Sequence, residues 1–267
     1  MSWNFHQLEE ENAEWVRDRF ANSIRMSEED LVDLTSGDLV GDDLADTGTV
    51  LRELSHAYGV RGVSRCMAGD SSGSEDLEVC VNAGLVAVRC FVQHYKCSKA
   101  GSFSRPVATA DEVSLILSAF ISFGDVGGLI GEVGEWVDSG LIDGLSSSAL
   151  FSLIGNYSGV FSGWLASEVD ADHAYRQIID GGLDDRSAFG LMSHYHKGRS
   201  DDPDDSGFPE FIASPWRECP VEILAYFRCK SVVPEFTPSD LCDPVWADVR
   251  FAGLMPDWLS KIQAKLL

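Results

Sequence analysis

Hydrophobic side chains recur every three or four residues between positions 72 and 97, as they do on one face of an amphipathic helix. Ser72 and Glu75 precede this stripe at the spacing of a capping box. The pattern therefore predicts one long helix that begins near Ser72. The stripe consists of Leu77, Val81, Leu85, Val88, Val92 and Tyr95.

A second helical pattern begins at Thr109, where Glu112 follows at capping-box spacing, and Gly124 is expected to end it. Asp125 can cap a further helix that ends at Gly140. The short link predicts an antiparallel or sharply angled pair. We expect this pair to be central and buried, because residues 113–137 are rich in apolar side chains and contain no Lys or Arg.

No alternating strand pattern of comparable strength is present, so the predicted fold class is all-α, a multi-helix globular bundle of about nine helices. Gly155, Gly159 and Gly163 follow one another at intervals of four, which predicts a helix with a smooth face that packs closely against a neighbour. The other helices are expected near residues 5–25, 47–60, 147–166, 171–180, 186–197, 220–230 and 256–266, with Pro220 and Pro256 opening the last two.

The main break in the pattern is an acidic, turn-rich segment that follows residue 198. It predicts a main helical domain at residues 1–198. Residues 199–267 would then be an acidic loop and a C-terminal helical segment packed on the same globule.

The net charge of the chain limits the kinds of partner that it can bind. The chain of 267 residues has 43 Asp and Glu against 20 Lys and Arg, a net charge of −23, while 45% of its residues are hydrophobic. It is therefore a folded acidic protein and not a disordered acidic tail. Such a charge opposes binding to nucleic acids and to anionic membranes and accelerates encounter with basic proteins. We expect a cationic protein as the partner, no nucleic acid and no membrane.

The seven cysteines are odd in number and show no C-x-x-C spacing, which predicts reduced core residues and no disulfide or zinc framework. The N-terminus has no basic and apolar regions typical of a signal peptide. The apolar stretch from Val113 to Val133 contains Asp125 and several glycines, so we interpret it as two buried helices and not as a membrane span. A cytoplasmic location is expected.

Candidate catalytic and metal motifs are incomplete. Residues 202–207 match the first half of an EF-hand loop, but Ala213 stands where the bidentate Glu is needed. His194 and His196 are two residues apart and would point away from each other on a helix. Phosphate-loop, dinucleotide-binding and zincin motifs are absent from the sequence. We expect no enzymatic activity, cofactor or metal; the alternatives are a metal-dependent hydrolase that uses His173, His194 and His196, or a helical scaffold.

The C-terminal part contains EFIASPW at residues 210–216 and PVEILAYFR at 220–228. Together with the acidic, all-helical character, these segments resemble the helical immunity proteins of bacterial polymorphic toxin systems. The resemblance implies a stoichiometric inhibitor that stays in the producing cell, binds a toxin domain and covers its active site.

Candidate partner-binding residues are acidic side chains beside turn-forming residues, where a partner can reach them. They form two clusters, at 38–46 and at 201–205. Affinity also needs an apolar or aromatic centre, for which Trp216 is the chosen anchor and Trp3, Phe208 and Phe211 are further candidates. The complete set is Asp38, Asp42, Asp43, Asp46, Asp201, Asp202, Asp204, Asp205 and Trp216.

Overall fold

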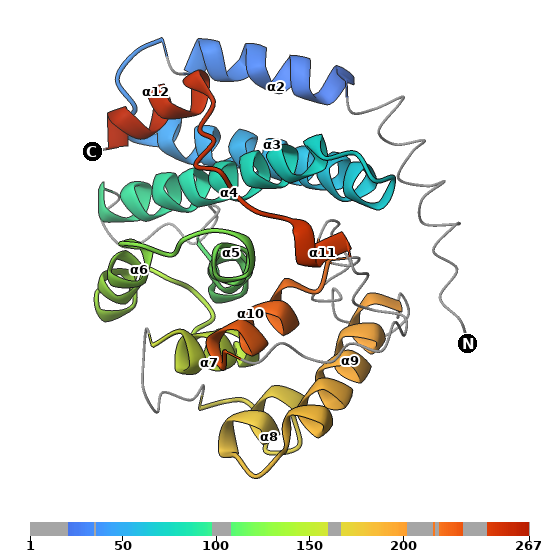
Figure 1. The fold of residues 1–267 in the computed structure, drawn as a ribbon. Helices are drawn as coiled ribbons and strands as arrows, with labels where there is room; N and C mark the ends of the chain where they lie inside the picture. The colour runs from blue at the N-terminus through green and yellow to red at the C-terminus, as the bar shows by residue number, and fades with distance from the viewer. Residues whose placement is uncertain are drawn as a thin grey trace. The chain divides into compact units, whose positions relative to one another are not determined.

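The computed structural model describes residues 21–34, 36–97, 108–159, 167–201, 216, 219–231 and 245–266 (Figure 1). These residues form helices, and the β-type pairing among them is one isolated bridge between Thr109 and Asp143. The all-α prediction is confirmed. The chain divides into two compact units, one made of Met1–Ala108 with Pro244–Leu267 and the other of Thr109–Asp243.

The first unit is built on two long antiparallel helices, α3 (Asp42–Met67) and α4 (Ser72–Cys97). The two helices pack against each other, and their buried side chains include Leu51, Val63, Leu77 and Val86. Helix α2 (Ala21–Leu34) packs on α3, and α12 (Asp257–Leu266) packs on α4. The short helix α11 (Val245–Asp248), which the sequence pattern did not predict, completes the unit.

Glycine makes the close approach of α3 and α4 possible. A Cβ atom added to Gly73 would lie 2.6 Å from the backbone nitrogen of Cys66, and one added to Gly62 would lie 2.8 Å from the backbone nitrogen of Leu77. These distances are shorter than van der Waals contact, so a side chain at either position would force the two helices apart locally.

Helix α4 begins at Ser72, as predicted, but the predicted capping box is not what holds its start. The carboxylate of Asp70 accepts hydrogen bonds from the backbone nitrogen and the hydroxyl of Ser72, at 2.9 and 2.8 Å. These bonds lower the pKa of Asp70 below its ordinary value, with a smaller contribution from Arg65. Asp70 therefore supplies the acceptor that we had assigned to Ser72.

The C-terminal segment of the first unit is held against α4 by side chains spaced one helical turn apart. Ser74 donates to the carbonyl oxygen of Arg250, and Asn82 donates to that of Leu254. Between them, the buried carboxylate of Glu78 accepts the backbone N–H groups of residues 252, 253 and 254. The contacts are made to the backbone of the segment, so they fix its path independently of its side chains.

The second unit has α5 (Ala110–Phe123) at its centre, packed against α7 (Ala149–Ser158) and α10 (Val221–Cys229). The predicted cap at Thr109 is confirmed, because its hydroxyl accepts from the nitrogen of Glu112 at 3.3 Å. Pro220 precedes α10 as predicted. The remaining helices of the unit are α6 (Leu129–Asp138), α8 (Ala174–Asp180) and α9 (Asp185–Asp201).

Three details of the second unit correct the sequence analysis. Asp125 does not cap α6: its carboxylate accepts from the nitrogen of Gly127 at 2.9 Å, and the helix begins only at Leu129. Helix α6 buries Leu129 but leaves Ile130 half-buried, so it is less central than α5.

The third correction concerns the glycine-spaced helix predicted at residues 147–166. Gly159 adopts a left-handed conformation with φ of 82° and ends α7 at Ser158. It therefore acts as a helix C-cap and not as part of a smooth packing face. Gly163 lies outside the described residues, as does most of the helix predicted at 5–25. The predicted boundary between residues 198 and 199 falls inside the second unit.

Candidate functional site

The aspartates of the first predicted cluster surround the N-terminus of α3, and all four side chains are exposed: Asp38, Asp42, Asp43 and Asp46. Gly41 stands at the N-cap with φ of 57° and offers no side-chain acceptor to the first turn. The carboxylates of Asp42 and Asp43 lie in that first turn, where the helix dipole favours negative charge. The fold thus gives these two residues a structural role in addition to the expected binding role.

The turn that carries this cluster is held by two contacts from distant parts of the chain. Nδ1 of His94 on α4 lies 2.8 Å from the carbonyl oxygen of Gly41, and because a carbonyl oxygen can only accept, Nδ1 is the protonated nitrogen. The ammonium group of Lys265 on α12 donates to the carbonyl oxygen of Gly37 at 2.6 Å. These two bonds hold the backbone of the turn in place. Neither His94 nor Lys265 was identified from the sequence.

Buried side chains on both sides of Gly41 fix the direction in which the aspartates point. Leu39 and Leu44 are buried, while Asp38, Val40 and Asp43 beside them are exposed. One turn later, a Cβ atom on Gly48 would lie 2.5 Å from Cε1 of Phe91, so α3 and α4 approach closely here as well. The apolar residues thus anchor the N-terminus of α3, and the carboxylates face solvent.

The second predicted cluster falls almost entirely outside the described residues. Asp201 is the last residue of α9, and its side chain is outside them, as are residues 202–215, which contain Asp202, Asp204, Asp205, Phe208 and Phe211. Trp216 lies in a turn and is half-buried. Trp216 belongs to the second unit and the 38–46 aspartates to the first. The proposed anchor role of Trp216 stays a prediction.

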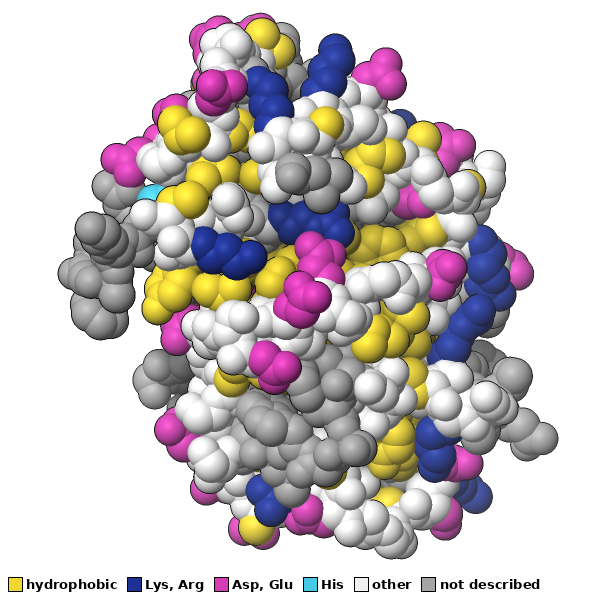
Figure 2. All heavy atoms as spheres, turned by 90° about the vertical axis from the view of Figure 1, so that its left-hand side faces the viewer, with side chains coloured by type: hydrophobic (Ala, Val, Ile, Leu, Met, Phe, Trp, Pro, Cys, Tyr) yellow, Lys and Arg dark blue, Asp and Glu magenta, His cyan; other side chains and the backbone are white. Residues whose placement is uncertain are grey.

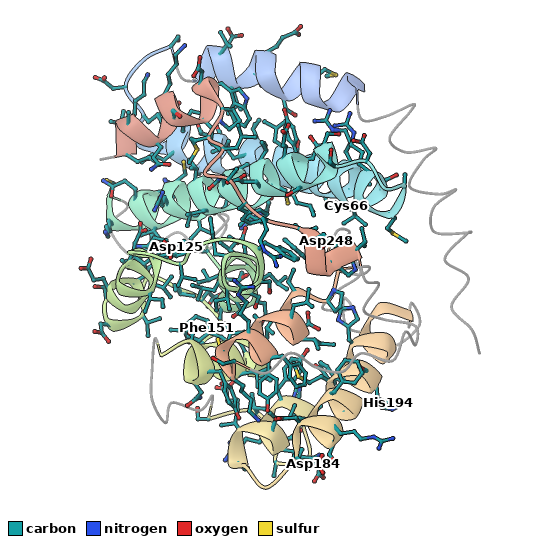
Figure 3. The ribbon with its side chains drawn as sticks, viewed as in Figure 1. Cys66, Asp125, Phe151, Asp184, His194 and Asp248 are labelled. Atoms are coloured by element: carbon teal, nitrogen blue, oxygen red, sulfur yellow. The ribbon has the colours of Figure 1, made fainter. Side chains whose placement is uncertain are left out.

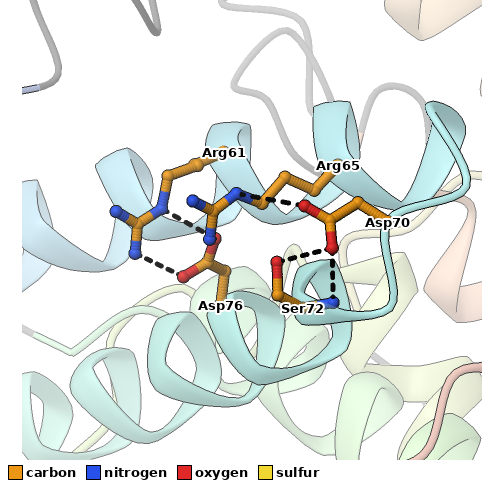
Figure 4. Close-up of polar contacts among 5 residues, drawn as sticks. All are labelled: Arg61, Arg65, Asp70, Ser72 and Asp76. Carbon is orange, nitrogen blue, oxygen red and sulfur yellow. Dashed lines mark hydrogen bonds and ion pairs between the residues drawn. The ribbon is translucent and has the colours of Figure 1, made fainter.

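Arg61 and Arg65, two basic residues of α3, form ion pairs within the first unit. The carboxylate of Asp76, whose side chain is 6% exposed, accepts from Nε of Arg61 and Nη1 of Arg65, both at 2.7 Å, and from Nη2 of Arg61 (Figure 4). Nε of Arg65 also lies 3.9 Å from Asp70. These guanidinium groups therefore offset internal carboxylates, so they do not form a free anion-binding patch.

The histidines that could have formed a metal site have separate environments. His194 is exposed on α9 (Figure 3), whereas His196, two residues later, is fully buried, with Nδ1 2.6 Å from Oε1 of Glu222. His173 caps α8: its Nδ1 accepts from the nitrogen of Tyr175, and its Nε2 lies 2.8 Å from the hydroxyl of Tyr195. Within the described residues, no group of three or more His, Cys, Asp or Glu could hold a metal ion.

The buried cysteines of the first unit are not reactive nucleophiles. Burial, followed by the charges of Asp76 and Asp70, raises the pKa of Cys66 to about 11. Burial raises the pKa of Cys80 and of Cys90 to about 12. Since the thiolate is the nucleophilic form, these residues are inert packing groups at neutral pH.

The chain was compared with protein families, curated proteins and solved structures. No family model, no curated protein and no solved structure matches the chain. Among the described helices, none is long and apolar enough to cross a membrane.

Proposed function

We propose that this protein is an immunity protein, a stoichiometric inhibitor that acts in the cytoplasm of the producing bacterium and neutralises a cationic toxin domain. One observation carries the proposal. Four aspartates are exposed around the N-terminus of α3, on a turn that α4 and α12 hold in place. Carboxylates can imitate the phosphates that a nucleic-acid-degrading or nucleotide-modifying domain binds, and because the backbone that carries them is held in place, it loses little entropy when the partner binds.

The distribution of charge supports this location. Figure 2 faces the side of Figure 1 on which the turn between α2 and α3 lies, and acidic and basic side chains are interspersed there. Residues 26–51 contain eight Asp or Glu and no Lys or Arg. The ammonium group of Lys265 lies beside Gly37 and offsets one of these charges, but the remaining carboxylates outnumber it and steer a cationic partner toward the segment. This segment is accordingly the first contact site that we assign.

The test begins with the partner that co-purifies with the untagged chain from its native cell. Replacing the four aspartates by asparagine should slow association by about tenfold at low salt and leave dissociation nearly unchanged, because exposed charges act mainly on encounter. Stopped-flow kinetics measure both rates. An activity assay of the partner should show loss of activity at one equivalent of this protein.

A control variant neutralises four exposed carboxylates that lie outside this cluster. Its substitutions are Glu135→Gln, Asp138→Asn, Asp170→Asn and Asp172→Asn. Equal slowing by both variants would show that only net charge matters and would refute the assigned location. A partner that binds but keeps its full activity would refute inhibition and favour a scaffold. Substrate turnover by the purified chain itself would favour the enzyme alternative.

A further inference from the structure

Exposed apolar side chains accompany the acidic segment. Among the described residues, the three most exposed large hydrophobic side chains are Val32, Val40 and Met26, at 68%, 63% and 57%. All three fall within residues 26–40. Isolated exposed hydrophobic residues are ordinary on protein surfaces, whereas three of them on one short segment offer a partner apolar surface to contact.

The outer side of α2 shows how the two kinds of side chain are interleaved. Ser27 and Leu31, one turn apart, are buried on the side of α2 that faces the rest of the unit. Met26, Glu29 and Asp33 follow the spacing of an opposite stripe and are exposed. Val32 and Asp30 flank this stripe and are exposed as well. An apolar contact here would therefore be bordered by carboxylates on both sides.

We call the exposed side chains of residues 26–46 the 26–46 surface. It consists of the outer side of α2, the turn that follows it and the start of α3. Its charge restricts what can cover it. A second copy of the chain would bring eight carboxylates against eight others, with the ammonium group of Lys265 beside Gly37 offsetting only part of the charge, and the net repulsion opposes such a dimer. Nucleic acids and anionic membranes are repelled for the same reason. A protein segment that alternates basic and apolar side chains matches both features.

We propose that the 26–46 surface binds a basic amphipathic segment of a partner protein, with Met26, Val32 and Val40 in contact with its apolar side chains and the surrounding carboxylates paired with its Lys or Arg. This inference rests on the proposed function and specifies how the cationic partner is recognised. The carboxylates determine the rate of encounter, whereas the three apolar side chains determine how long the complex lasts.

The test uses the full chain and a synthetic probe. The probe is a helical peptide of about 18 residues made of Lys, Ala and Leu, with Leu on one face. A shuffled peptide of the same composition has the same charge but no apolar face. In about 0.15 M salt, the amphipathic peptide should bind more tightly than the shuffled one, and its amide chemical-shift changes should map to residues 26–46.

The variant Val32→Ser with Val40→Ser should weaken binding of the amphipathic peptide by about tenfold, because the lost contact is apolar. Leu183→Ser, at an exposed apolar position of the second unit, is the matched control and should change nothing. Far-UV circular dichroism verifies that both variants are folded. Equal affinity for the two peptides, shifts outside residues 26–46, or unchanged affinity of the double variant would overturn the inference.

The experiments distinguish an error in this recognition mode from an error in the proposed inhibitor function. If the native partner is inhibited equally by the wild-type chain and by the Val32→Ser, Val40→Ser variant, the inhibitor proposal stands and this recognition mode is wrong. If the peptide binds as described but no partner loses activity, the recognition mode stands and the inhibitor proposal fails.

Discussion

At the residue scale, Glu78 determines the position of a segment more than 170 residues away in sequence. Its carboxylate accepts N–H groups from Ala252, Gly253 and Leu254 at 2.9, 2.6 and 2.7 Å. A carboxylate has acceptors and no donor, so it suits three converging donors. In Glu78→Gln, an amide NH₂ would face one or more of these N–H groups. We expect the free energy of unfolding to fall by about 2 kcal/mol, measured by chemical denaturation.

Glu75→Gln is the control for this substitution, because Glu75 lies on the same helix and is exposed. It removes the same charge without changing a buried contact, so stability should change by less than about 0.5 kcal/mol. Equal effects of the two substitutions would show that charge, and not the contact to the C-terminal segment, is responsible.

The cysteines give a second prediction at this scale. Burial raises the pKa of Cys66 to about 11 and of Cys80 and Cys90 to about 12, whereas Cys97 is exposed. At about pH 8 the three buried thiols stay protonated and shielded, so iodoacetamide should modify Cys97 well before them. Peptide mapping by mass spectrometry measures the order. Rapid modification of Cys80 in the folded protein would show that the core opens locally.

At the element scale, the turn between α3 and α4 depends on the absence of a side chain at Gly73. In Gly73→Ala, the new Cβ atom would meet the nitrogen and the sulfur of Cys66, each at 2.6 Å. The backbone nitrogen cannot move away independently, so the two helices must separate locally. We expect a loss of about 2 kcal/mol or more of stability, followed by denaturant unfolding.

Gly131→Ala provides the matched comparison. Gly131 is also helical, but nothing lies within 4 Å of the position that its Cβ atom would occupy. Alanine has the higher helix propensity, so this substitution should stabilise the protein by about 0.5–1 kcal/mol. Destabilisation of similar size by both substitutions would contradict the steric explanation.

The helices differ in how far the sequence predicts them. Helix α4 follows a regular apolar stripe, and its predicted start at Ser72 is confirmed. Helix α3 begins at Asp42, several residues before the predicted helix at 47–60, because Thr47 and Gly48 have low helix propensity and their burial against the rest of the unit compensates for it. Local pattern predicts an element well where propensity and burial agree, and less well where tertiary packing decides.

The candidate site shows the same limit. The exposure of the aspartates at the N-terminus of α3 agrees with the sequence analysis, since charge and turn residues are local signals. The contacts of His94 and Lys265 to this turn span 53 and 228 residues, and no local pattern encodes them. The exposure of Val32 and Val40 was also missed, because periodicity alone does not show which side of a helix, or which residue of the turn after it, stays uncovered.

At the scale of the whole molecule, two electrostatic effects oppose each other. The net charge of −23 produces repulsion among carboxylates, which destabilises the compact state at low ionic strength. Ion pairs such as Arg61 with Asp76 act in the other direction, but the Asp76 side chain is 6% exposed, so dissolved salt screens this pair only weakly. Repulsion between exposed aspartates is screened strongly. Added salt should therefore remove more repulsion than attraction.

We expect the thermal midpoint of unfolding to rise by about 2–4 °C between about 0.01 and 0.15 M NaCl, because the Debye length falls from about 30 to 8 Å over that range. Differential scanning calorimetry measures the shift. In the variant with asparagine at positions 38, 42, 43 and 46, the shift should be smaller, since four of the repelling charges are gone. A midpoint that falls with salt would show that exposed ion pairs outweigh the repulsion, and the acidic segment would then be neutralised internally and unable to attract a cationic partner over a distance.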